Sequence, residues 1–66
     1  MKHEIYLQLA PEKIDLLTRL IEAYNHLGIV STLDRQKGKV VVRVTPDTYH
    51  DVYKILQHLP FPIQIL

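Results

Sequence analysis

The chain has 66 residues, of which 47% are hydrophobic and 23% are charged, and its formal net charge is +1. This length fits one small domain, residues 1–66, and the apolar content excludes a disordered chain. The chain has no cysteine, which excludes disulfides and thiolate metal sites. A nearly neutral charge gives no strong attraction to nucleic acid or to an anionic membrane.

The first residues lack the long apolar run of a signal peptide, and no stretch approaches the ~20 apolar residues that a membrane span requires. The sequence therefore predicts a soluble cytoplasmic protein. A domain of this size buries only about 60% of its unfolded surface. Because no disulfide adds stability, we expect the chain to form a homo-oligomer, most simply a dimer.

The N-terminal half predicts a strand followed by a helix. Residues 3–9 alternate between apolar and polar side chains, which is typical of a half-buried strand. Residues 12–27 predict a helix, because their apolar side chains fill one half of the helical wheel. Pro11 suits the first turn of this helix, and Gly28 suits a left-handed residue after its last turn.

Residues 29–34 and 39–45 predict a hairpin whose four-residue loop ends at Gly38, where a left-handed backbone is expected. Pairing Asp34 with Lys39 brings the apolar side chains of the two strands to one face, which favours this register over a slip of one residue. The expected inward-facing residues are Ile29, Ser31, Leu33, Val40, Val42 and Val44.

Thr45-Pro46-Asp47 predicts the start of a second helix, because it combines a hydroxyl cap, a proline and an acid. Pro60 and Pro62 end this helix. The apolar residues that follow predict a last strand at the sheet edge, since proline cannot donate to a central ladder. The helical tyrosines are expected to pack on the core with their hydroxyls at its rim: Tyr24, Tyr49 and Tyr53.

This order of elements predicts an α+β, ferredoxin-like βαββαβ sandwich, because two interleaved right-handed strand–helix–strand units produce that arrangement. The third strand lies between the first and second, and the first lies between the third and fourth. Both helices cover one face of the four-stranded antiparallel sheet.

The other face of the sheet is predicted to be open. The candidate interface or ligand residues on it are Tyr6, Gln8, Val30, Thr32, Asp34, Val41 and Arg43, and Gln64 and Leu66 are expected beside them. Aliphatic side chains and a tyrosine on an open face predict that another chain covers part of it.

The sequence carries no motif for catalysis, a metal or a cofactor. His50 and His58 share a helix face but lie about 12 Å apart, too far for one ion with bonds of about 2 Å. The other histidines, His3 and His26, are expected at a strand start and a helix end. Ser31 is expected to point inward, with no histidine placed to activate it. We therefore expect a protein that is not an enzyme and binds no metal or cofactor.

RNA-recognition modules of this topology stack bases on aromatic side chains of the central strands. Tyr6 and Arg43 are expected to be adjacent on the open face, which is the nearest equivalent here. One tyrosine and a nearly neutral charge make a weak platform. Single-stranded RNA binding is therefore a lesser alternative to contact with another protein chain.

Several short motifs mark helix ends and turns: Glu22-Ala23-Tyr24, Leu27-Gly28-Ile29-Val30, Thr32, Asp34, Gly38 and Val44-Thr45-Pro46-Asp47. With these motifs nearly the whole chain resembles a small bacterial family known only as a domain of unknown function. The motifs have structural tasks, so this resemblance implies no activity.

The topology is also similar to ACT-type regulatory domains, which bind amino acids at dimer interfaces near the first strand–helix loop. Those domains typically carry a glycine in that loop, where this chain has Leu9-Ala10-Pro11-Glu12. The sequence favours a self-associating module that forms a homodimer through the open sheet face or an edge strand and senses a small ligand or none. A small-molecule-binding regulatory domain of ACT type is the alternative.

Overall fold

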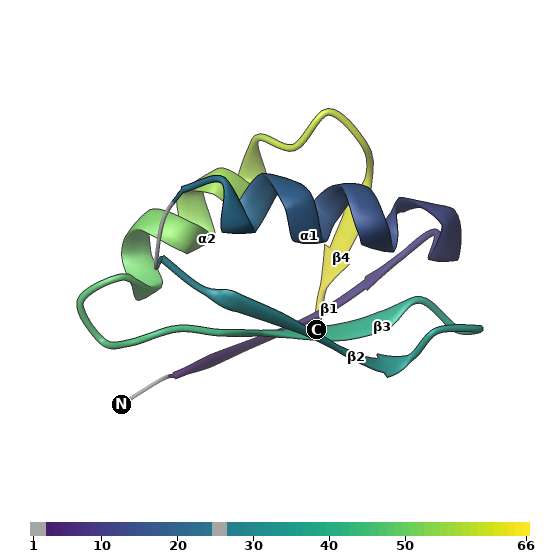
Figure 1. Cartoon of the computed structure of the whole chain (residues 1–66), viewed down its shortest axis with the longest axis horizontal. Coiled ribbons are helices and arrows are strands. Elements are labelled where there is room, and N and C mark those ends of the chain that lie inside the picture. Colours follow the sequence, from purple (N-terminus) through teal and green to yellow (C-terminus); the bar gives the residue numbers. More distant parts are fainter. Residues whose placement is uncertain (1–2, 25–26) are drawn as a thin grey trace.

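The computed structural model describes residues 3–24 and 27–66 (Figure 1). The elements, in chain order, are strand β1 (Glu4–Leu9), a 3₁₀ turn (Pro11–Lys13), helix α1 (Ile14–Glu22), strand β2 (Ile29–Asp34), strand β3 (Lys39–Arg43), helix α2 (Tyr49–Gln57) and strand β4 (Ile63–Ile65).

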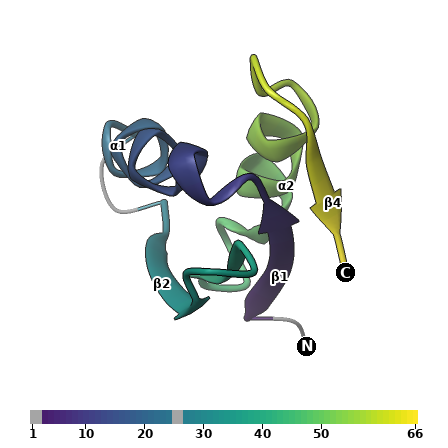
Figure 2. The same ribbon diagram turned by 90° about the vertical axis from the view of Figure 1, so that its right-hand side faces the viewer.

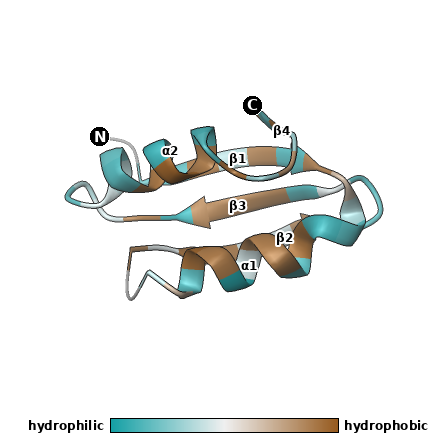
Figure 3. Cartoon of the chain, turned by 90° about the horizontal axis from the view of Figure 1, so that it is seen from above, coloured by the Kyte–Doolittle hydropathy of each residue, from teal (hydrophilic) through white to brown (hydrophobic). Residues whose placement is uncertain are grey.

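The four strands form one antiparallel sheet in the order β2-β3-β1-β4. Both helices lie on the same face of this sheet, α1 above β2 and α2 above β1 (Figures 2 and 3). The predicted ferredoxin-like α+β arrangement and its strand order are therefore confirmed. Strand β4 lies at the edge beside β1, as the prolines before it predict.

The core fills the space between the sheet and the helices. Figure 3 shows the hydrophobic stretch of β3 running between the two helices. Burying each of these side chains stabilises the fold by about 1.5–3 kcal/mol. The core residues are Ile5, Leu7, Leu9, Ile14, Leu17, Ile21, Val40, Val42, Val44, Val52, Leu56 and Phe61.

Helix α1 is shorter than the predicted helix over residues 12–27. It begins at Ile14 and ends at Glu22, where the Tyr24 amide donates to the Ile21 carbonyl oxygen at 3.2 Å and closes a tighter last turn. Residues 25 and 26, and with them the expected helical site of His26, lie outside the described residues. Because the helix stops early, Tyr24 leaves the apolar face and is 51% exposed, so its predicted place on the core is wrong.

The two glycines have different tasks. Gly38 has a φ of 70°, which confirms the predicted left-handed position in the hairpin loop. Gly28 does not adopt a left-handed backbone, so its predicted role as a helix stop is wrong. It instead allows a close approach to β3, because a Cβ there would lie 3.2 Å from the Arg43 carbonyl oxygen and 3.3 Å from Cγ1 of Val44.

Helix α2 begins at Tyr49, after a turn, and not directly after Thr45. The Tyr49 amide donates to the Thr45 carbonyl oxygen at 3.0 Å, and the Thr45 amide donates to Oγ1 of Thr48 at 3.0 Å. No side chain caps α2: Thr48 precedes the helix and its hydroxyl accepts the Thr45 amide within the turn before it, so the predicted cap by the Thr45 hydroxyl is wrong. Tyr49 and Tyr53 pack against the core as expected, with ring centroids 6.0 Å apart.

The β2–β3 hairpin pairs Asp34 with Lys39 as predicted, but the register changes beyond that pair. A β-bulge lies between Thr32 and Asp34, so Thr32 pairs with Val40 and Val30 pairs with Val42. The predicted pairs of Leu33 with Val40, Ser31 with Val42 and Ile29 with Val44 are wrong. One extra residue in β2 turns every earlier side chain of this strand to the opposite face.

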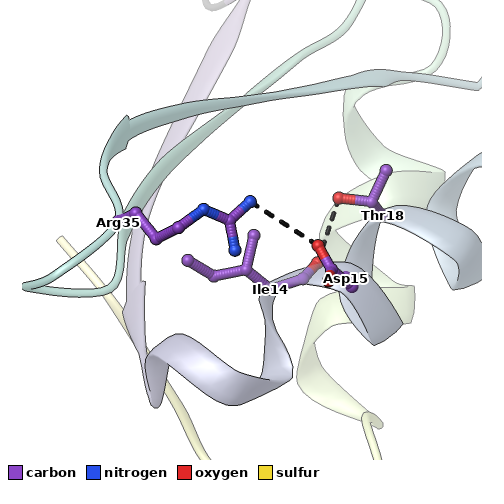
Figure 4. Close-up of polar contacts among 4 residues, drawn as sticks. All are labelled: Ile14, Asp15, Thr18 and Arg35. Carbon is purple, nitrogen blue, oxygen red and sulfur yellow. Dashed lines mark hydrogen bonds and ion pairs between the residues drawn. The ribbon is translucent and has the colours of Figure 1, made fainter.

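An ion pair links the hairpin loop to α1, and a hydrogen bond within α1 lies beside it (Figure 4). Nη2 of Arg35 lies 3.5 Å from Oδ1 of Asp15, with both side chains mostly exposed. Nearby, the Thr18 hydroxyl donates to the Ile14 carbonyl oxygen at 3.0 Å. An exposed ion pair of this kind contributes little to the stability of the fold.

Gly38→Ala is expected to lower the free energy of unfolding by at least about 2 kcal/mol. The new Cβ would clash with the Leu9 carbonyl oxygen, and an L side chain is strained at this φ. Chemical denaturation of both proteins measures the change. Gly28→Ala is the comparison variant, with a milder loss because its backbone is not left-handed; an equal loss in the two variants would contradict the assignment.

Candidate interface on the open sheet face

The face of the sheet away from the helices carries its side chains in three rows across the strands. The rows follow from the pairing of β1 with β3 and β4, and of β2 with β3. The first row is Ile29, Arg43 and Glu4; the middle row is Ser31, Val41, Tyr6 and Leu66; the last is Leu33 with Asp34, Lys39, Gln8 and Gln64.

The bulge corrects two of the candidate residues. Val30 pairs with Val42 and packs against the core, so it lies on the helix side of the sheet. Thr32 pairs with the core residue Val40 and shares that side. The structure therefore removes Val30 and Thr32 from the open face and brings Ile29, Ser31 and Leu33 to it.

The other candidates lie on the open face, and several have structural partners. The Gln8 side chain donates to the Lys37 carbonyl oxygen at 3.0 Å, and the Lys37 amide donates to Oδ1 of Asp34 at 3.1 Å. Gln8 and Asp34 thus hold the hairpin loop. Val41 is only 1% exposed although it does not belong to the core cluster, so its neighbours on the open face cover it.

Tyr6 and Arg43 meet through a third residue, Glu4. The Tyr6 hydroxyl donates to Oε1 of Glu4 at 2.9 Å, and Nη1 of Arg43 lies 3.7 Å from Oε2 of Glu4. The hydrogen bond to Glu4, followed by the charge of that carboxylate, raises the pKa of Tyr6 above its ordinary value of 10.0. A carboxylate between the aromatic ring and the guanidinium repels a nucleic-acid phosphate, so this is a poor base-stacking platform.

The open face is also notably apolar for an exposed surface. Ile29 is 64% exposed, Leu66 59%, Leu33 55% and Tyr6 44%. These side chains lie on β2, β1 and at the end of β4, around the covered Val41. Exposed apolar side chains that gather on one face mark an interaction surface more often than scattered ones do.

Sequence reasoning missed Glu4, Ile29 and Leu33. The sequence could have identified Glu4, because alternate residues of a strand share a face and Glu4 lies two residues before Tyr6 and four before Gln8. Ile29 and Leu33 carried no such signal, since regular alternation with the Asp34–Lys39 pair places them inward and only the bulge reverses them.

Two further observations concern the described part of the chain, residues 3–24 and 27–66. Its His, Asp and Glu side chains form no group of three that is close enough to hold a metal ion. None of its helices combines the length and the apolar character needed to cross a membrane.

A family model described as "Domain of unknown function (DUF4911)" matches residues 7–63. The match spans most of the sequence, so the chain belongs to this family. No curated protein and no solved structure matches the chain.

Glu4→Gln is expected to lower the pKa of Tyr6, because the charged acceptor that favours the protonated hydroxyl is removed. In the unchanged protein the hydrogen bond stabilises the fold at neutral pH, and this contribution is lost as the pH rises through the raised pKa of Tyr6. The NMR chemical shift of the Tyr6 Cζ carbon, followed across a pH titration, measures the pKa of Tyr6 in the unchanged protein and in Glu4→Gln. An unchanged pKa in Glu4→Gln would contradict the role of Glu4.

Proposed function

We propose that this member of the DUF4911 family is a non-enzymatic, self-associating module that acts in the cytoplasm and buries its open sheet face in a homodimer. The observation that carries the proposal is the set of exposed apolar side chains on that face, Tyr6, Ile29, Leu33 and Leu66. A chain this small gains stability when a second copy covers such a surface.

The size of the face suits a dimer of modest area. The chain extends 31 × 21 × 17 Å, and the sheet lies in the plane of the longest and shortest of these axes (Figures 1 and 3). A rectangle of these two lengths measures about 530 Å² for each chain and about 1,050 Å² for two, so contact over the whole face is needed to reach the ~1,000 Å² expected of a specific interface. Two sheets stacked about 10 Å apart form a sandwich with a shared apolar layer.

The charges on the face favour one orientation of the two copies. Strands β3 and β1 are the central pair, and Arg43 on β3 lies beside Glu4 on β1. A two-fold axis parallel to these strands and between them puts β3 of each copy opposite β1 of the other. Arg43 then faces Glu4 of the second copy, while Val41 faces Tyr6 of the second copy. A two-fold axis perpendicular to the strands would instead put β3 of each copy opposite β3 of the other. Arg43 would then face Lys39 of the second copy, and these two positive charges repel each other.

The first strand–helix loop offers less to an amino-acid ligand than the open face offers to a second copy. The Leu9 amide donates to the Gly38 carbonyl oxygen at 2.9 Å, and the Lys13 amide donates to the Ala10 carbonyl oxygen at 2.8 Å. Two backbone donors of this loop are therefore already paired within the chain. This supports the self-associating module over an ACT-type binding domain.

The unchanged chain is expected to have about twice its monomer mass of 7.7 kDa at micromolar concentration, measured by light scattering. Leu33→Lys places an unpaired charge in the dimer interface, so we expect its dimer dissociation constant to rise at least about tenfold. Sedimentation equilibrium measures this constant, and circular dichroism checks that the variant is folded.

Thr32→Lys is the matched control. It adds the same charge one residue away on β2, at an exposed position on the helix side of the sheet, and should leave the dimer intact. A monomer at every concentration up to about 1 mM would contradict self-association. Equal dissociation in the two lysine variants would place the interface at the β2 edge and not on the open face.

A further inference from the structure

A groove with apolar walls runs between the two helices, on the side of the molecule opposite the open sheet face. On α2, Val52 and Leu56 point into the core, so Ile55 lies toward α1; Leu59, two residues after the end of the helix, lines the same space. Leu20 of α1 faces them. These half-buried aliphatic side chains line a space of about 310 Å³, which is at the lower end of the range for small-molecule sites.

The rim of the groove is polar and carries positive charge. Lys54 in the last turn of α2 and His58, the first residue after this helix, are both exposed, and Tyr24 lies across from them after the end of α1. Pro60 also lies at the rim. Among the described residues, no carboxylate lines this groove, and Lys54 and His58 make no ion pair.

We infer that this groove binds a small monocarboxylate with an apolar tail. The tail would lie on Leu20, Ile55 and Leu59, and the carboxylate would lie at the rim, within reach of the Lys54 ammonium group. His58 and the Tyr24 hydroxyl offer further hydrogen-bond donors to the carboxylate. The side chains of Lys54 and Tyr24 can cover the tail while their polar ends stay in water.

Because the groove lies beside the C-terminus of α2, binding of an anion there depends on the positive charge of Lys54. Helix α2 ends at Gln57, so partial negative charge from its last carbonyl groups lies close to the rim and works against an anion. The His58 amide donates to the Ile55 carbonyl oxygen at 3.1 Å, which satisfies one of those groups. The side-chain cation must outweigh the others, and a neutral ligand of the same shape would gain nothing from it.

Octanoate is a suitable probe, with octan-1-ol as the neutral compound of the same length and octylammonium as the cation. We expect saturable binding of octanoate to the full chain in an NMR titration, with amide shifts centred on Leu20, Ile55 and Leu59. Octanol should bind more weakly. Lys54→Gln should weaken octanoate binding about fivefold and leave octanol binding unchanged.

Lys54→Glu should reverse the preference, so that octylammonium binds more tightly than octanoate. Lys37→Gln removes the same charge from the exposed hairpin loop and should change nothing. Equal affinity for octanoate and octanol, no effect of Lys54→Gln, no saturable binding, or shifts centred on the open sheet face would each overturn the inference. Because the groove and the sheet face are on opposite sides, a monomeric protein would leave this result unaffected.

Discussion

The bulge in β2 between Thr32 and Asp34 determines which side chains of this small fold remain uncovered. It keeps Asp34 opposite Lys39 at the hairpin loop while turning Val30 into the core beside Val42. Ile29 and Leu33 then point to the open face, where more than half of each is exposed. This apolar pair faces water in the unfolded chain as well, so it contributes little burial to the lone chain, and a second copy on that face would supply that burial.

The loop between β2 and β3 fixes where the bulge can lie. Gly38 packs so closely on Leu9 that no side chain fits there, and the Leu9 amide donates to the Gly38 carbonyl oxygen at 2.9 Å. The end of the loop is thereby held against the end of β1, and Asp34 accepts the Lys37 amide within the loop. With both contacts in place, an extra residue in β2 is accommodated on the far side of Asp34, where an edge strand can bend.

The sequence alone was enough to predict the element order, the strand order and the layer of the helices, because each of these depends on periodicity and chain connectivity. The sequence was insufficient to predict which side chains lie on the open face. The sequence of a strand does not reveal a bulge, because a bulge is defined only by the pairing with the neighbouring strand. The helix predicted from the sequence was also too long at its C-terminal end, because the apolar pattern continues to Leu27. In the structure the chain leaves α1 after Glu22, early enough for Gly28 to reach β3.

The groove between the helices and the open sheet face lie on opposite sides of the same hydrophobic core. Ile55 and Leu59 line the groove and pack on the core from the helix layer, while Val41 and Tyr6 lie on the outer side of the sheet. In a sandwich dimer the helices of both copies face outward, so each groove stays open and no residue of one site enters the other. A ligand in the groove would shift the dimer equilibrium only if its affinity for the monomer and for the dimer differed, for example through a movement of a helix against the sheet.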